Sequence, residues 1–241
     1  MFRPRLGPTL FSMTMTCICI GLGVWQLQRL EWKRGLIAQR QAALAAPPAP
    51  VPQSHGDISG RELHPVTDTG EFLNDRETLI HAIGPKGGAG FDVLTPLREA
   101  SGRIVMVNRG YVPSERKDRA RREAGEPAGS VRVTGLLRLP LAAKPGWFIP
   151  ENHPEIGSWF WLDLTAVAAA EHLGNVAPFY IDADATPNPG GWPQGRAAPP
   201  ELPNNHLQYA ITWFSLAAAA VLIYVLSQRH PVTSDDRIPR T

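Results

Sequence analysis

The sequence is poor in cysteine and in net charge. Only two of its 241 residues are cysteine, which excludes a disulfide framework and a four-cysteine zinc site. Its 24 basic and 22 acidic residues leave a formal net charge of +2. A general nucleic-acid-binding protein concentrates Lys and Arg into a basic surface, so this balance argues against nucleic acid as a partner.

The usual catalytic signatures are also missing. The sequence has no nucleophile elbow, no phosphate-binding loop, no zincin helix motif and no Cys-x-x-Cys. The Gly-Ala-Gly run at residues 88–90 lacks the third glycine of a dinucleotide fingerprint and is better explained as a hairpin loop. Cys17 and Cys19 would point about 200° apart on a helix and cannot chelate one ion together. We therefore expect no enzymatic activity.

Long stretches without a charged residue lie near both ends of the chain. Residues 6–28 and 202–228 contain no Asp, Glu, Lys or Arg. Each can cross a hydrocarbon core of roughly 30 Å at about 1.5 Å per helical residue. We predict transmembrane helices at residues 10–28 and 205–227. A cleaved signal peptide is the alternative for the first, because Arg3 and Arg5 precede it, but no small-residue cleavage site follows.

The two predicted spans divide the rest of the chain. The remaining segments are an N-terminal tail (1–9), a helix continuation with a proline-rich linker (29–54), a soluble β-rich domain (55–183), a Pro/Gly-rich linker (184–204) and a C-terminal tail (228–241). An even number of spans places both termini on one side of the membrane. Basic residues flank the spans about equally on both sides, so charge does not assign the orientation.

The soluble segment is rich in strand signals. Runs of β-branched or aromatic residues predict strands at 77–83, 91–97, 104–112, 131–139, 159–164 and 179–181, with a glycine-rich hairpin loop at 84–90. We predict helices at 114–124, capped by Ser114, and at 165–173, capped by Thr165. The predicted fold class is α+β: two transmembrane helices, one N-terminal and one C-terminal, flank a β-dominated soluble domain with one or two helices.

Aromatic and basic side chains gather at the loop-side ends of both predicted spans. By helical spacing one face carries His206, Tyr209 or Ala210, and Trp213, and on the first helix one face carries Trp25, Arg29 and Trp32. Both faces lie in the same leaflet in either orientation. A histidine nitrogen can bind haem iron, aromatic rings can pack on the macrocycle and an arginine can pair with a propionate. An interfacial aromatic belt is the alternative, and spacing alone favours it.

A set of short segments along the chain follows the order of a known family. These segments are 23–33 (GVWQLQRLEWK), 70–77 (GEFLNDRE), 91–97 (FDVLTPL), 107–113 (VNRGYVP), 150–152 (PEN), 159–163 (WFWLD) and 205–210 (NHLQYA). Together they resemble the Surfeit locus protein 1 family of cytochrome oxidase assembly factors. Each segment alone is a weak signal, but the ordered set framed by two spans is highly specific. The linkers and the acidic pair at 235–236 carry no resemblance.

The resemblance implies a bacterial, multi-pass inner-membrane protein with both termini cytoplasmic and a periplasmic soluble domain. It implies help in delivering haem a to the large catalytic subunit of cytochrome c oxidase. Some bacterial members are similar in binding haem a through a histidine that falls on His206, which we therefore predict as the iron ligand, with Tyr209, Trp213, Trp25 and Arg29 as cofactor-binding neighbours. The implied partners are the oxidase subunit, the enzyme that makes haem a and the lipid bilayer. The alternative is an assembly scaffold that binds the oxidase subunit without haem.

Two basic segments of the soluble part allow two interpretations each. Residues 108–110 form either a partner-binding or haem-edge patch or, as we favour, a structural site in which Arg109 bonds loop carbonyls or Asp75. Residues 116–122 include five basic residues. We interpret them as a solvated helix face, with anionic headgroups as the alternative partner.

Overall fold

The protein consists of two compact units. The structure is a computed structural model that describes residues 5–53, 58, 60–196, 199 and 201–228. One unit lies within residues 1–39 and 201–241 and is helical. The other lies within residues 40–200 and contains every strand of the described chain.

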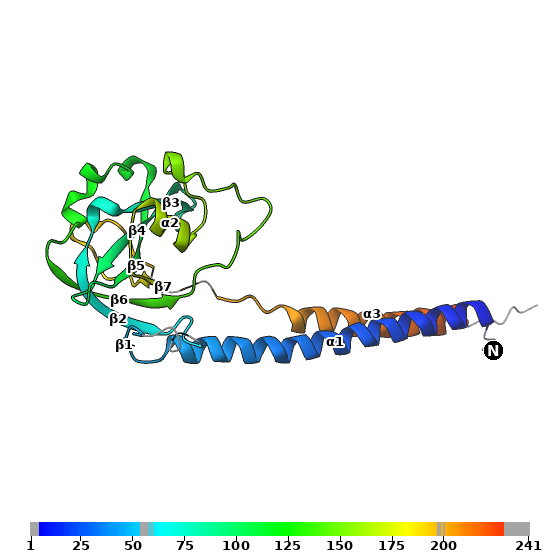
Figure 1. The fold of residues 1–241 in the computed structure, drawn as a ribbon. Coiled ribbons are helices and arrows are strands. Elements are labelled where there is room, and N and C mark those ends of the chain that lie inside the picture. Colours follow the sequence, from blue (N-terminus) through cyan, green and yellow to red (C-terminus); the bar gives the residue numbers. More distant parts are fainter. Residues whose placement is uncertain (1–4, 54–57, 59, 197–198, 200, 229–241) are drawn as a thin grey trace, which may run out of the picture. The chain divides into compact units, whose positions relative to one another are not determined.

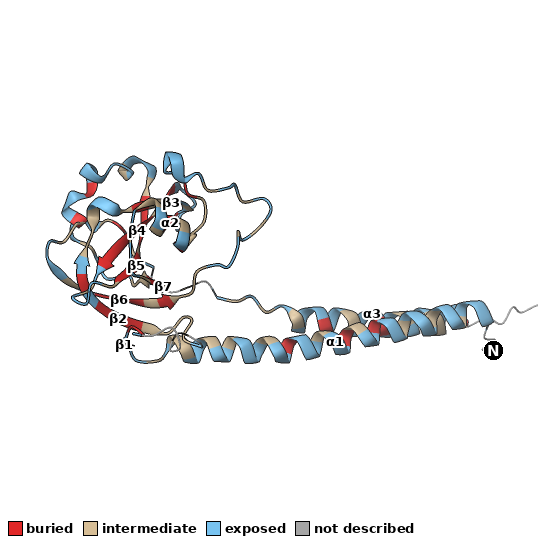
Figure 2. Ribbon diagram, in the orientation of Figure 1, coloured by how far each residue is buried: buried red, intermediate tan, exposed pale blue. Residues whose placement is uncertain are grey.

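The helical unit is an antiparallel pair of long helices, α1 (Leu6–Leu44) and α3 (His206–Ser227) (Figure 1). Most of their residues are exposed (Figure 2), although both helices are long and apolar enough to cross a membrane. Apolar side chains that face outward are expected where lipid is the solvent. The predicted spans at 10–28 and 205–227 coincide with these helices, except that residue 205 lies just outside α3, and the continuation after residue 28 extends to Leu44.

Small residues allow the two helices to approach closely. The buried positions are Cys19, Gly23 and Leu30 on α1 and Ala210 and Ala217 on α3. A methyl group added at Gly23 would lie 2.7 Å from the ring of Phe214. This packing explains why the two cysteines of α1 act as ordinary helix residues, one exposed and one in the seam.

The β-rich unit is a sheet that closes on itself. Its strands are β1 (Ala49–Pro50), β2 (Pro65–Phe72), β3 (Thr78–Ile83), β4 (Ala89–Arg98), β5 (Ile104–Pro113), β6 (Ser130–Arg138) and β7 (Val176–Ala183). The sheet order is β1-β2-β6-β7-β5-β4-β3, and β2 also pairs with β4. Strands β2, β6, β7, β5 and β4 therefore form a closed ring, in which only the β5–β7 pair is parallel.

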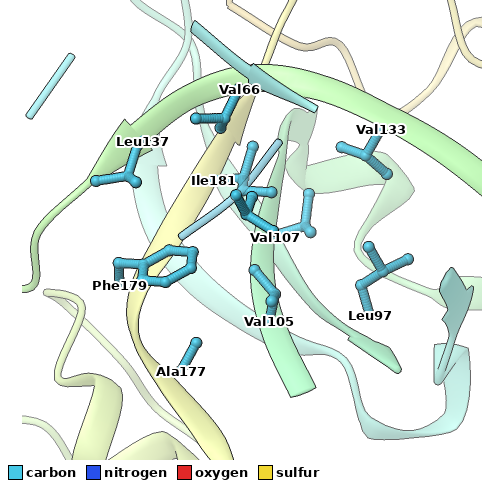
Figure 3. Close-up of a cluster of buried hydrophobic side chains, with 10 residues drawn as sticks. Val66, Leu97, Val105, Val107, Val133, Leu137, Ala177, Phe179 and Ile181 are labelled. Atoms are coloured by element: carbon cyan, nitrogen blue, oxygen red, sulfur yellow. The ribbon is translucent and has the colours of Figure 1, made fainter. Parts of the chain in front are cut away.

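The interior of this barrel is a valine-rich core. Alternate residues of each strand point inward, so Val105 and Val107 of β5 meet Phe179 and Ile181 of β7 (Figure 3). The other members of this cluster are Val51, Val66, Leu97, Val133, Leu137 and Ala177. Helix α2 (Leu164–Ala170) covers the outside, where Leu164 and Val167 join a second buried cluster.

Most strand predictions are confirmed, and one is wrong. The predicted strands at 77–83, 91–97, 104–112, 131–139 and 179–181 coincide with β3 to β7. Residues 159–164 form no strand, because the side chain of Asn152 accepts hydrogen bonds from the backbone N–H groups of Phe160 and Trp161. Strand β2 was not predicted, since its inward positions include Asp68 and Gly70 rather than an alternation of large apolar residues.

Both helix predictions in this unit need correction. Residues 114–124 form two 3₁₀ segments, η3 (Ser114–Arg116) and η4 (Arg119–Gly125), and Asp118 caps the second by accepting from Ala120 N–H. Helix α2 begins at Leu164 and ends at Ala170, and its cap is Asp163 rather than Thr165. Further 3₁₀ turns are η2 (Asn74–Arg76), η5 (Pro154–Ile156) and η6 (Pro189–Gly191).

The basic segment 116–122 is not a uniformly solvated face. Arg122 is buried and forms a two-pronged ion pair with Glu77. Arg119 pairs in the same way with Glu126 through two bonds of 2.6 Å. Burial of a guanidinium requires such a partner, so Arg122 links η4 to the residue just before β3, whereas the half-exposed Arg119 pairs with the residue that follows η4.

The chain after β7 continues along the barrel. Tyr111 and Gln194 exchange two backbone hydrogen bonds of 2.9 Å, and Arg196 N–H donates to Ala183. Residues 184–196 of the segment expected to be a linker therefore pack on the β-rich unit.

Candidate functional site

The first residue of α3 is His206, and its ring contacts the partner helix. The Nδ1 atom lies 2.7 Å from Oε1 of Gln26 on α1. An amide oxygen only accepts hydrogen bonds, so the imidazole carries its proton on Nδ1. In the neutral ring the lone pair then lies on Nε2, which is the arrangement that a metal-ligating histidine with an oriented second nitrogen requires.

The seam between the two helices determines this contact. On α1 the residues Cys19, Gly23, Gln26 and Leu30 follow one another at spacings of four, three and four, so they form one stripe. Ala210, the next buried residue of α3, lies one turn after His206 on the same face. At the opposite end of the pair, the hydroxyls of Thr9 and Tyr224 lie 2.7 Å apart and Ser12 donates to Ala220. Polar contacts thus join the helices at both ends.

The other predicted site residues lie around this contact rather than in it. The guanidinium of Arg29 lies 4.3 Å from the ring centroid of Trp32, one turn along α1. Trp25 and Tyr209 are each about half exposed, and Trp213 is partly buried. The structure therefore pairs Arg29 with Trp32 and leaves Trp25 and Tyr209 half exposed.

Gln26 is the functional candidate that spacing analysis did not select. Gln26 is neither charged nor aromatic, and it lies one position away from Trp25 on a different face of the helix. The available signal was the polar amide itself, placed among apolar residues of a predicted span. Such a side chain needs a hydrogen-bonding partner on the neighbouring helix.

Residues 108–110 make hydrogen bonds that hold loops of the soluble unit. Arg109 is buried, and its Nη2 donates to the carbonyl of Gly125 and to Oδ1 of Asn188 at 3.2 Å. Asn108 accepts from Gly110 N–H and donates to Asp182 at 2.9 Å. The prediction that Arg109 bonds a loop carbonyl is confirmed, and the carbonyl is that of Gly125.

Comparison with known proteins identifies the family. The model of the SURF1 family matches residues 13–218, a range that includes most of α1, the whole barrel and the first half of α3. The chain belongs to the SURF1 family. A SURF1-like protein of Monosiga brevicollis is 35% identical over 90% of this chain and 86% of its own length. Surfeit locus protein 1 of Mus musculus is 32% identical, covering 89% of this chain and 73% of its own, and that of Homo sapiens is 33% identical, covering 85% and 72%.

The side chains of this SURF1-family protein suit one kind of metal site. Among the described residues there is no group of three or more His, Cys, Asp or Glu side chains that could hold a bare metal ion. A haem needs only one or two protein ligands, because its macrocycle supplies four. A single histidine whose Nδ1 bonds Gln26, on a helix pair that exposes Trp25 and Tyr209, fits an axial ligand.

Proposed function

We propose that this protein is a membrane-anchored, non-catalytic assembly factor for cytochrome c oxidase that binds haem a through His206 and delivers it to the large catalytic subunit. The observation that carries the proposal is the hydrogen bond between His206 Nδ1 and Gln26 Oε1. It joins the two candidate membrane helices and leaves Nε2 as the nitrogen for iron. Membership of the SURF1 family supports the same role.

Each residue of the site has a separate task. Gln26 accepts from Nδ1 and holds the ring plane of His206. Trp25, Tyr209 and Trp213 offer ring faces to the macrocycle, and Arg29 offers a cation to a propionate. One protein ligand on an exposed helix pair allows release, which a carrier of haem requires.

The two apolar helices and membership of the SURF1 family support a membrane location. We place the protein in a bacterial inner membrane as a multi-pass protein, with both termini cytoplasmic and the β-rich unit periplasmic. The lipid bilayer surrounds α1 and α3, whose apolar side chains face outward. The large oxidase subunit receives the haem, and the enzyme that makes haem a supplies it.

The test is an absorption spectrum of the protein purified from cells that make haem a. The wild-type protein should carry haem a, His206→Ala should lose nearly all of it, and Gln26→Leu should retain a reduced amount with a shifted Soret band. His153→Ala is the matched control, because His153 is an exposed histidine outside the helix pair. Equal haem content in His206→Ala and the wild type would contradict the assignment of the ligand.

A scaffold function is the second candidate, and the outward-facing aromatic rings favour it. Trp25, Tyr209 and the Arg29–Trp32 stack are also what an interfacial belt presents to headgroups. In that case the protein would hold the oxidase subunit without touching haem. Co-purification of the oxidase subunit with a haem-free assembly factor would support the scaffold and reject the carrier.

A further inference from the structure

One mouth of the barrel contains a pocket of about 290 Å³. Its apolar wall comes from Phe72, Val107, Val131 and Val133, and its polar lining from Arg109, Arg132, Asp184 and Asn188. The volume is close to the lower end of small-molecule binding sites, which in barrels lie at the mouth. The pocket lies wholly within residues 40–200 and does not depend on the role of His206.

Arg109 brings an incompletely satisfied cation to this pocket. Its inward direction follows from β5, because it alternates with Val105 and Val107 of the barrel core. Only 2% of Arg109 is exposed, and its Nη1 has no hydrogen-bond partner among the described residues. An unsatisfied donor on a buried charged group costs free energy comparable to a lost charged hydrogen bond.

Neighbouring carboxylates do not neutralise Arg109 by contact. The acids whose fields act on it are Glu77 and Glu126. Glu77 already pairs with Arg122, and Glu126 with Arg119. Burial lowers the pKa of Arg109 to about 10, so the group is still a cation at neutral pH.

We propose that this pocket binds a carboxylate carried on a small apolar group. The free Nη1 amino group of Arg109 can donate a charge-assisted hydrogen bond to one carboxylate oxygen, and the ring of Phe72, 4.6 Å from the guanidinium carbon, closes one side. The valine side chains then cover the apolar part of the ligand. Asn188 holds Nη2 in place, which leaves Nη1 for the incoming oxygen.

The lining charges predict how variants change the affinity. Arg132 is exposed at the rim and adds a second positive charge, whereas the Asp184 carboxylate opposes an anion. Asp184→Asn keeps the acceptor for Thr186 N–H and removes only the charge. It should therefore tighten binding of a carboxylate about threefold, and Arg132→Gln should weaken binding about threefold.

The experiment is calorimetric titration of the full-length protein in nanodiscs with benzoate and with its neutral isostere benzamide. Benzoate should bind at least about tenfold more tightly than benzamide. N-acetylphenylalanine, compared with its amide, tests whether the carboxylate at a polypeptide C-terminus is the better ligand. Arg109→Gln should abolish the preference for the acid in both pairs.

Arg109→Gln could lose binding because it fails to fold. Asp184→Asn is a separate test, because a damaged domain does not gain affinity. Asp75→Asn, an exposed carboxylate outside the pocket, should leave the affinity unchanged. Equal binding of each acid and its amide would overturn the proposal. So would an Asp184→Asn variant that binds benzoate no more tightly than the wild type.

Discussion

Replacement of Asp68 by asparagine should stabilise the protein at neutral pH. Asp68 is buried on β2, on the same face as Val66. Its Oδ1 accepts from Thr69 N–H at 2.8 Å, but Oδ2 has no donor among the residues that the structure describes. Burial raises the pKa of Asp68 from 3.8 to about 6, and the Glu99 carboxylate adds to the increase, whereas Thr69 N–H and Arg103 oppose it.

The direction of the pH dependence follows from this increase. The folded protein holds the proton more tightly than the unfolded chain, so the associated stability is complete below pH 4 and is lost as the pH rises through 6. The increase from 3.8 to about 6 corresponds to at most about 3 kcal/mol. Solvent and Arg103 screen part of this, so we expect ionised Asp68 to lower the free energy of unfolding by about 1 to 2 kcal/mol.

Asparagine reproduces the uncharged carboxyl, because it has nearly the same shape and its Oδ1 can still accept from Thr69 N–H. Thermal unfolding of the full-length protein, followed by circular dichroism, should show Asp68→Asn melting about 3 to 6 °C above the wild type at pH 8. At pH 4.5 the difference should shrink to about a third of this value. Asp75→Asn, at an exposed ion pair, should shift the midpoint by under about 2 °C. An Asp68→Asn variant destabilised at pH 8, or one with the same pH profile as the wild type, would refute the reasoning.

Two further substitutions test the packing of the β-rich unit, each by denaturant unfolding. Glu77→Gln should lower the free energy of unfolding by about 3 to 5 kcal/mol, because Arg122 is then buried without its charge partner. Glu71→Gln, in the exposed pair with Arg98, should lower it by under about 1 kcal/mol. Gly110→Ala should lower the free energy of unfolding by more than about 3 kcal/mol, since Gly110 has a φ of +104° and the new methyl group would overlap a backbone carbonyl. Gly102→Ala should lower it by about 1 kcal/mol, because Gly102 has a φ of +82° but open space around it. Equal losses within either pair would contradict the packing described.

Much of the fold could be predicted from the sequence because its strands carry uninterrupted apolar signals. Residues 104–112 and 131–139 are of this kind, and β5 and β6 lie where the pattern placed them. Strand β2 was missed because tertiary pairing with β6, rather than local propensity, keeps Asp68 and Gly70 in the sheet. The run at 159–164 buries Trp159 and Leu164 without forming a strand, since burial can be satisfied by a loop whose backbone donors bond to a side chain.

Of the two residues in the contact between the helices, only His206 could be predicted from the sequence. His206 stood out as a titratable residue at the start of an apolar helix. The contact with Gln26 depends on the register between two helices that are separated by 180 positions in the chain. Helical periodicity within one segment defines a face, but it contains no information on which residue of a second helix lies opposite.

The position of β7 also determines when the domain can close. The last strand in chain order lies between β5 and β6, so the ring is open until residues 176–183 have left the ribosome. Before then, β5 and β6 each have an edge of unpaired backbone groups that other strands can extend. A nascent chain is therefore most at risk of aggregation just before its second membrane helix is made, and a premature stop ahead of residue 176 would yield an open sheet rather than a shorter working domain.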